Sequence, residues 1–200
     1  MRPEFVYFDL GNVLLFFDHD LAMRKMARIA GVTFEQMRTI VMDSNLQIEY
    51  ETGSISSLQF VSRISDAVSR DLDKADMLQA AADMFIPNPH ILPVLQRVRE
   101  LGIPTGLLSN TCEAHWHWIV EQQYPQVKGW FQPIVLSYEA KSMKPARSIY
   151  QQAEKLAGVP SSSIFFTDDR PDNVQAAVDA GWQAEVFVNA DRLMKTVDQW

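Results

Sequence analysis

The stretch that most constrains the fold lies near the start of the chain, where the apolar run Phe5-Val6-Tyr7-Phe8 is followed directly by Asp9. Such a run is typical of a β-strand that is buried on both faces of a parallel sheet. Gly11-Asn12 follows as a turn signal. Open parallel sheets bind their ligands at the carboxyl ends of the strands. Asp9 is therefore either a functional carboxylate at such an end or simply the residue that begins the turn.

The second half of the chain alternates between helix-like and strand-like hydrophobic patterns. Helices are expected at residues 91–101, 112–123, 146–157 and 173–180, and strands at residues 103–108, 132–136, 163–167 and 184–188. Together with the first strand, this alternation indicates an α/β domain with a parallel sheet, because each crossover between parallel strands runs through a helix.

Residues 17–87 interrupt the alternation and carry helical patterns only. Two capping-box pairs, Thr33 with Gln36 and Ser56 with Gln59, open helices within this segment. Helices are expected at residues 21–30, 33–48, 56–68 and 74–85. The segment shows neither a strand pattern nor a catalytic motif.

We therefore predict an α/β fold with a doubly wound, Rossmann-like parallel-sheet core and a small all-helical cap inserted after the first strand. Residues 1–16 and 88–200 would form the core and residues 17–87 the cap. With 47% hydrophobic residues, 200 residues suffice for one core and a smaller appendage.

Composition narrows the range of partners. A net charge of −7 argues against nucleic acid or an anionic membrane as the main partner. The single cysteine, Cys112, forms no internal disulfide and fits a reducing compartment. No apolar run reaches transmembrane length, and the first strand is too short for a signal peptide, so we expect a cytoplasmic protein. The oligomeric state stays open.

Polar side chains follow three of the predicted strands directly: Asp9, Ser109-Asn110 and Asp168-Asp169. The carboxyl ends of parallel strands share one edge of the sheet, so these groups are expected to converge. Three carboxylates would repel one another there, and a hard divalent cation with oxygen ligands would offset that repulsion. Mg²⁺ commonly combines one or two carboxylates with phosphate oxygens, which points to a phosphorylated substrate.

Four segments stand in order along the chain: Phe8-Asp9-Leu10-Gly11-Asn12-Val13, Leu107-Leu108-Ser109-Asn110, Met143-Lys144-Pro145 and Phe166-Thr167-Asp168-Asp169. In this order and spacing they resemble the four motifs of the haloacid dehalogenase-like (HAD) hydrolases. Within that superfamily the chain is most similar to the sugar-phosphatase branch of the bacterial α-D-glucose-1-phosphate phosphatases. The resemblance covers nearly the whole chain, and the helical insertion matches a small four-helix cap.

The resemblance implies that Asp9 is a nucleophile that takes up a phosphoryl group as an aspartyl-phosphate. It also implies that Asp9 and Asp169 bind Mg²⁺ together with the backbone carbonyl of Gly11. Asp168 would either bind the metal through water or orient Lys144.

By the same resemblance, Ser109 and Asn110 hold the transferring phosphate, and Lys144 stabilises its charge. The expected function is Mg²⁺-dependent hydrolysis of a small phosphorylated metabolite, in the first place a sugar phosphate. One alternative is a 2-haloacid dehalogenase with the same aspartate, although that chemistry needs no metal. The other is a phosphate-binding module without turnover.

One position departs from the pattern of most phosphatases in the superfamily. Gly11 stands where they carry a second aspartate that acts as general acid and base. Protonation of the leaving group is then unassigned, which would favour sugar-1-phosphates over sugar-6-phosphates. Asp18 is either the N-cap of the first cap helix or a substitute acid. His115 and His117 lie two apart on a predicted helix and therefore make a poor metal pair.

Overall fold

A five-stranded parallel sheet forms the centre of the molecule in the computed structural model, which describes residues 1–200. The strands are β1 (Phe5–Phe8), β4 (Thr105–Ser109), β5 (Ile134–Leu136), β6 (Ile164–Asp168) and β7 (Gln183–Val186). Their order is β5-β4-β1-β6-β7, and every pairing is parallel. β1 is thus the central strand, and all four of its residues are buried, as its apolar run predicts.

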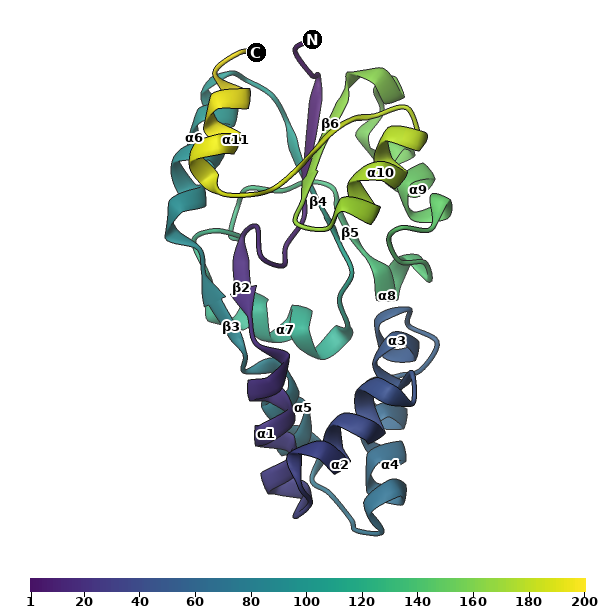
Figure 1. Cartoon of the computed structure of the whole chain (residues 1–200). Helices are drawn as coiled ribbons and strands as arrows, with labels where there is room; N and C mark the ends of the chain where they lie inside the picture. The colour runs from purple at the N-terminus through teal and green to yellow at the C-terminus, as the bar shows by residue number, and fades with distance from the viewer.

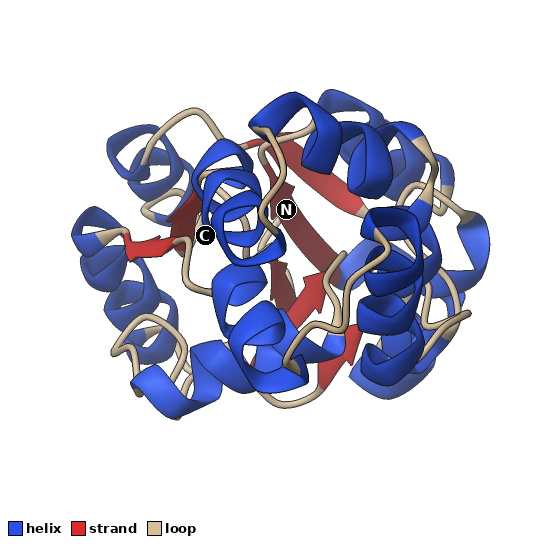
Figure 2. Ribbon diagram, turned by 90° about the horizontal axis from the view of Figure 1, so that it is seen from below, coloured by secondary structure: helices blue, strands red, loops and turns tan.

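Helices cover both faces of the sheet (Figures 1 and 2). On one face lie α6 (Leu92–Glu100) and α11 (Ala190–Val197), and on the other lie α9 (Arg147–Ala157) and α10 (Pro171–Asp179). Successive residues of β1 supply both cores. Val6 and Phe8 belong to the apolar cluster with α6 and α11, whereas Tyr7 belongs to the cluster with α9 and α10. The alternation of side chains along a strand explains why this strand has no polar face.

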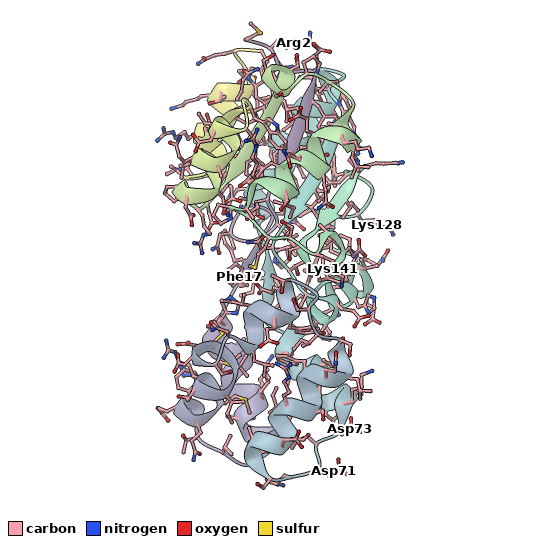
Figure 3. The ribbon with its side chains drawn as sticks, turned by 90° about the vertical axis from the view of Figure 1, so that its right-hand side faces the viewer. Arg2, Phe17, Asp71, Asp73, Lys128 and Lys141 are labelled. Atoms are coloured by element: carbon pink, nitrogen blue, oxygen red, sulfur yellow. The ribbon has the colours of Figure 1, made fainter.

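The segment between β2 and β3 folds into helices around an apolar cluster that we call the cap core (Figure 3). Cys112 and Ala114 of the sheet domain also belong to this cluster. Its helices are α1 (His19–Ala30), α2 (Phe34–Arg38), α3 (Leu46–Glu51), α4 (Ser57–Val68) and α5 (Lys74–Ala82). Both predicted capping boxes are present, and Asp18 caps α1 by accepting a hydrogen bond from the backbone N–H of Leu21. A cluster built mainly from this segment supports our division of the chain into residues 1–16 with 88–200 and residues 17–87, which stays a proposal.

The predicted helix over residues 33–48 is divided in the structure. A π-helical turn, η1 (Thr39–Asp43), follows α2, and α3 begins only after Asn45. Asn45 has a φ of 65°, a left-handed conformation that interrupts a right-handed helix.

Two short strands connect the cap to the sheet domain. β2 (Leu15–Phe17) pairs antiparallel with β3 (Phe85–Pro87). The expectation that residues 17–87 contain no strand is therefore wrong at both ends, and the helix expected over 74–85 ends at Ala82. Pairing with a segment about seventy positions away makes these residues strands, and no local pattern shows such a partner.

The remaining elements lie around the strand ends. α7 (Glu113–Gln122) lies between the sheet and the cap, and α8 (Ser137–Ala140) directly follows β5. Short 3₁₀ turns are present at η2 (Pro89–Ile91) and η3 (Ser161–Ser163). No helix has both the length and the apolar character that crossing a bilayer requires.

Candidate functional site

Three carboxylates meet at the carboxyl edge of the sheet. Asp9 follows β1, Asp168 ends β6 and Asp169 comes next, and their nearest oxygens all lie within 4.8 Å of one another. The pairing register causes this, because Phe8 lies opposite Thr167 and the next residue of each strand is an aspartate. Asp9 and Asp168 are buried, whereas Asp169 is partly exposed. The convergence that the strand ends predict is therefore present in the structure.

Lys144 is the buried cation of this cluster. Its Nζ donates to Asp9 Oδ1 at 2.6 Å, to Asp168 Oδ2 at 2.5 Å and to the carbonyl of Leu108 at 2.9 Å. These three bonds use all three ammonium donors. One lysine faces three carboxylates, so an excess negative charge remains that a divalent cation would offset.

Burial sets the protonation of this group of side chains. Burial raises the pKa of Asp9 to about 7, while the charge of Lys144 opposes this rise and that of Asp168 adds to it. Burial opposes the charge on Lys144, but the two carboxylates outweigh it and raise the pKa of the ammonium. Lys144 is therefore charged at neutral pH, and a cation near Asp9 would favour the ionised carboxylate.

Asp168 is fully engaged by protein donors. Besides Lys144, it accepts from the backbone N–H of Arg170 at 2.8 Å and from Asn173 Nδ2 at 3.0 and 3.1 Å. Of the two roles that the sequence left open for Asp168, this geometry favours orienting Lys144.

Asp169 has far fewer partners. Asn12 Nδ2 donates to its Oδ2 at 2.8 Å, which leaves Oδ1 for another ligand. The carbonyl of Gly11 accepts no hydrogen bond, whereas that of Leu10 accepts two. Carboxylate and carbonyl oxygens of this kind are the ligands that Mg²⁺ prefers.

The side-chain amide of Asn110 is engaged by the backbone of Lys144. Its Nδ2 donates to the carbonyl of Lys144 at 2.8 Å, and its Oδ1 accepts from the Lys144 N–H at 2.7 Å. The amide therefore holds the lysine loop in place, and only its backbone N–H is left for an anion. Ser109 ends β4 and is buried, and its hydroxyl makes only a long bond of 3.4 Å to the Asn110 carbonyl. A phosphate-binding role for both residues stays a prediction.

The side-chain space at Gly11 is filled from the cap side. A Cβ at this position would lie 2.7 Å from Cε1 of Phe17, which lies at the junction between the two parts of the molecule (Figure 3). The Phe17 ring in turn contacts His19 edge-on, with 4.8 Å between ring centroids. A larger residue at position 11 would therefore have to displace this aromatic contact.

A cavity of about 50 Å³ lies between the strand ends and the cap. Gly11 and Ser109 line it from the sheet domain, and His19, Glu51 and His115 line it from α1, α3 and α7. No local pattern marks these last three as site residues, because helical spacing does not tell which helix face meets a distant strand end. Burial, with His19 nearby, lowers the pKa of His115 to about 3, so its ring is neutral. His117 is exposed, so the two histidines lie in different surroundings.

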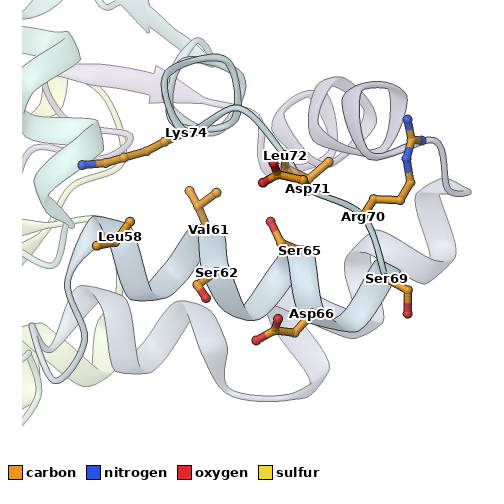
Figure 4. A pocket seen from close by; sticks show the side chains of 10 residues that line it. All are labelled: Leu58, Val61, Ser62, Ser65, Asp66, Ser69, Arg70, Asp71, Leu72 and Lys74. Carbon is orange, nitrogen blue, oxygen red and sulfur yellow. The ribbon is translucent and has the colours of Figure 1, made fainter.

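A larger hollow lies elsewhere. An open depression of about 680 Å³ runs along α4 at the far end of the cap (Figure 4). Serines and charged side chains line this depression, among them Ser65, Arg70 and Lys74. None of the predicted site residues lies there, so the strand ends remain the candidate site.

Replacing Lys144 by Met tests how strongly the lysine stabilises the fold. We expect the free energy of unfolding to fall by about 3–5 kcal/mol, because Asp9 and Asp168 would stay buried without their cation. Urea unfolding with a chelator present measures this loss. The control is Lys25→Met, which removes a half-exposed ion pair with Asp83 and should cost at most about 1 kcal/mol. Equal losses in the two variants would contradict this assignment.

Comparison with known proteins identifies a family match that includes the site residues. The family model described as haloacid dehalogenase-like hydrolase matches residues 5–181. The pyrimidine 5'-nucleotidase YjjG of Escherichia coli is 23% identical over 95% of this chain and 88% of its own. A D-ribitol-5-phosphate phosphatase of Bacteroides thetaiotaomicron is 24% identical over 89% of this chain and 88% of its own.

A solved structure has the same fold. The HAD family enzyme bt-2542 of Bacteroides thetaiotaomicron, in complex with magnesium and inorganic phosphate, superposes with a TM-score of 0.82. It is 24% identical, and the match covers 92% of this chain and 93% of that one. This similarity confirms the predicted α/β fold with its parallel sheet flanked by helices.

Proposed function

The chain belongs to the haloacid dehalogenase-like hydrolase family, and from this premise we propose that it is a Mg²⁺-dependent phosphatase of small phosphorylated metabolites. The observation that carries the proposal is the cluster of Asp9, Asp168 and Asp169 around a single buried lysine. Such a cluster needs a cation, and with that cation it suits an anionic phosphate ester.

The donor set at the strand ends fits magnesium. Asp9, Asp169 and the carbonyl of Gly11 would hold the ion, which when bound would neutralise phosphate oxygens. Asp168 would act on the site through Lys144, whose position it fixes.

Asp9 would be the nucleophile of the reaction. One carboxylate oxygen accepts from Lys144, and the other would attack the phosphorus in line with the leaving oxygen. Lys144 would keep the carboxylate aimed and stabilise the charge on the transferring group. Ser109, at the end of the neighbouring strand, would hold a phosphate oxygen through its hydroxyl.

We propose a sugar phosphate as the substrate. Two relatives named for a nucleotide and for a polyol phosphate support a small phosphorylated metabolite, without selecting one. The cavity of about 50 Å³ has room for a few water molecules at most, so the cap would have to move for an ester to enter.

A screen of phosphorylated metabolites for phosphate release, with Mg²⁺ and with a chelator, tests the proposal. We expect release that depends on Mg²⁺. Metal-independent release of halide from 2-haloacids would instead assign the dehalogenase reaction, and binding of phosphate without turnover would assign a binding module.

Replacing His19 by Ala tests whether the cap selects the substrate. His19 lines the cavity from α1, so we expect the ranking of sugar phosphates to change, with hydrolysis of a small generic ester changing less. The measurement is kcat/KM across the series. Arg24→Ala, an exposed position on the same helix, is the control and should leave the ranking unchanged. If His19→Ala scales all substrates equally, the cap is only structural.

A further inference from the structure

Gly11 leaves the reaction without an obvious proton donor for the leaving group, and a replacement would have to lie at or near the cavity. Asp18 does not qualify. It is exposed, its carboxylate accepts from the N–H of Leu21 as a helix cap, and it does not line the cavity. His115 does not qualify either, because its lowered pKa keeps the imidazole neutral at working pH.

Glu51 is the one carboxyl group that the cap contributes to the cavity. It is the last residue of α3, and Gln47, one turn earlier, donates from Nε2 to its Oε1 at 2.7 Å. This bond engages one oxygen and leaves Oε2 as the atom available to a ligand. Gln47 is itself buried, so the orientation of the carboxyl group is fixed from behind.

Two side chains of the sheet domain donate hydrogen bonds to main-chain carbonyls at and just after the end of α3. The buried hydroxyl of Ser137, at the start of α8, lies 2.6 Å from the carbonyl of Glu51, to which it donates. Lys141 Nζ donates to the carbonyl of Gly53 at 2.7 Å.

The backbone of Tyr138 approaches Gly53 so closely that position 53 requires a glycine. Gly53 has a φ of 65°, and a Cβ there would lie 2.1 Å from the Tyr138 carbonyl oxygen. Only glycine fits both conditions, so the turn after Glu51 is suited to this docking.

The surroundings of Glu51 favour its neutral, proton-carrying form. Burial raises the pKa of its carboxyl group, while the hydrogen bond from Gln47 and the more distant charge of Arg170 lower it less. The other titratable side chains facing the cavity are His19 and His115.

Thr111, which also lines the cavity, has a side-chain hydroxyl without a hydrogen-bond partner. The hydroxyl of Thr111 is buried, with 2% of the residue exposed, and makes no hydrogen bond. It lines the same cavity as Glu51, beside Ser109. A buried hydroxyl without a partner costs free energy, and a water or a substrate oxygen in the cavity would satisfy it.

Resting on the proposed phosphatase function, we propose that Glu51 is the general acid and base of the reaction and takes the role left open by Gly11. Thr111 orients the oxygen to which Glu51 gives its proton. The donor then comes from the cap, so that phosphoryl transfer requires the cap to be docked. This assignment fills the role of proton donor that the sequence leaves unassigned. Esters whose leaving groups have a high pKa then become acceptable substrates.

Protons and bonds balance over the two steps. In the first, Asp9 forms a bond to phosphorus, the bond to the leaving oxygen breaks, and that oxygen takes the proton from Glu51 Oε2. The products are the free alcohol, the aspartyl-phosphate and an ionised Glu51. In the second, water attacks phosphorus and gives a proton to Glu51, the bond to Asp9 breaks, and inorganic phosphate leaves.

The test is the dependence of single-turnover rates on leaving-group pKa, measured with Mg²⁺ for a series of aryl phosphates and one alkyl phosphate. We expect a shallow dependence in the wild type. Glu51→Gln keeps the size of the side chain but has no acidic proton. It should lose about 10²–10⁴-fold on the alkyl phosphate and little on the most acidic phenol, giving a steep dependence.

Two matched variants accompany this measurement. Glu49→Gln removes a half-exposed carboxylate of the same helix, paired with Arg63, and should follow the wild type. Asp18→Asn tests the rival donor and should also keep the shallow dependence.

The outcomes are distinct. An equal loss on all esters in a Glu51→Gln protein of unchanged thermal stability, or no loss, would overturn the proposal. So would a steep dependence in Asp18→Asn alone. If Glu51→Gln does not fold, Glu51→Asp retains an acid at a greater distance and should change the slope in the same direction, and an unchanged slope would again overturn the proposal. Failure of the wild type to hydrolyse even the most reactive ester would instead contradict the phosphatase function itself.

Discussion

Turnover is expected to fall by on the order of 10⁴-fold or more when Asp9 is replaced by Asn, because an amide cannot form the aspartyl-phosphate. The amide has nearly the same shape as the carboxylate. Lys144 would keep its bonds to Asp168 and to the Leu108 carbonyl, so the fold should remain intact. The measurement is kcat for the best substrate found, together with thermal unfolding.

The matched control for this variant is Asp20→Asn, an exposed carboxylate on α1 that should leave turnover unchanged. Substantial activity in a well-folded, repurified Asp9→Asn protein would remove Asp9 from the nucleophilic role.

Replacing Asp169 by Ala should lower both Mg²⁺ affinity and turnover. Asp169 accepts only one side-chain hydrogen bond, from Asn12, so its loss should disturb the fold less than loss of Asp168 would. A bound metal contributes several kcal/mol to charge stabilisation in the transition state, which corresponds to a loss of about 10²-fold or more. Excess Mg²⁺ should restore part of the rate. Rates across a Mg²⁺ titration, and thermal shifts with Mg²⁺ alone, measure both effects.

Asp172→Ala is the control for the metal assignment, since this exposed carboxylate pairs with Arg170 outside the cluster. Activity that survives exhaustive chelation in the wild type would contradict the metal site and favour the dehalogenase reaction.

The sequence by itself determined the central strand and the convergence of carboxylates at its end. Phe5–Phe8 is apolar throughout because both faces of β1 are buried, and this pattern needs no knowledge of its neighbours. Once a parallel sheet is inferred, Asp9 and Asp168 must meet at one edge, and the structure has them there. The sequence also predicts Asp18 and Thr33 as N-cap candidates, because a cap acts within one helical turn.

Only the tertiary structure decided which further side chains face this edge. Glu51 and His19 belong to cap helices whose sequences show an apolar face but not what their polar ends meet across the gap. The amide of Asn110 is engaged by the Lys144 backbone, a contact between loops thirty-four positions apart.

The pairing of β2 with β3 has the same origin, because Phe16 lies opposite Ile86 although the whole cap separates them in the sequence. Local patterns are set by burial and backbone conformation within a few residues. Contacts between distant segments depend on how complete helices pack, and that packing decided whether a carboxyl group of the cap would line the cavity beside Gly11.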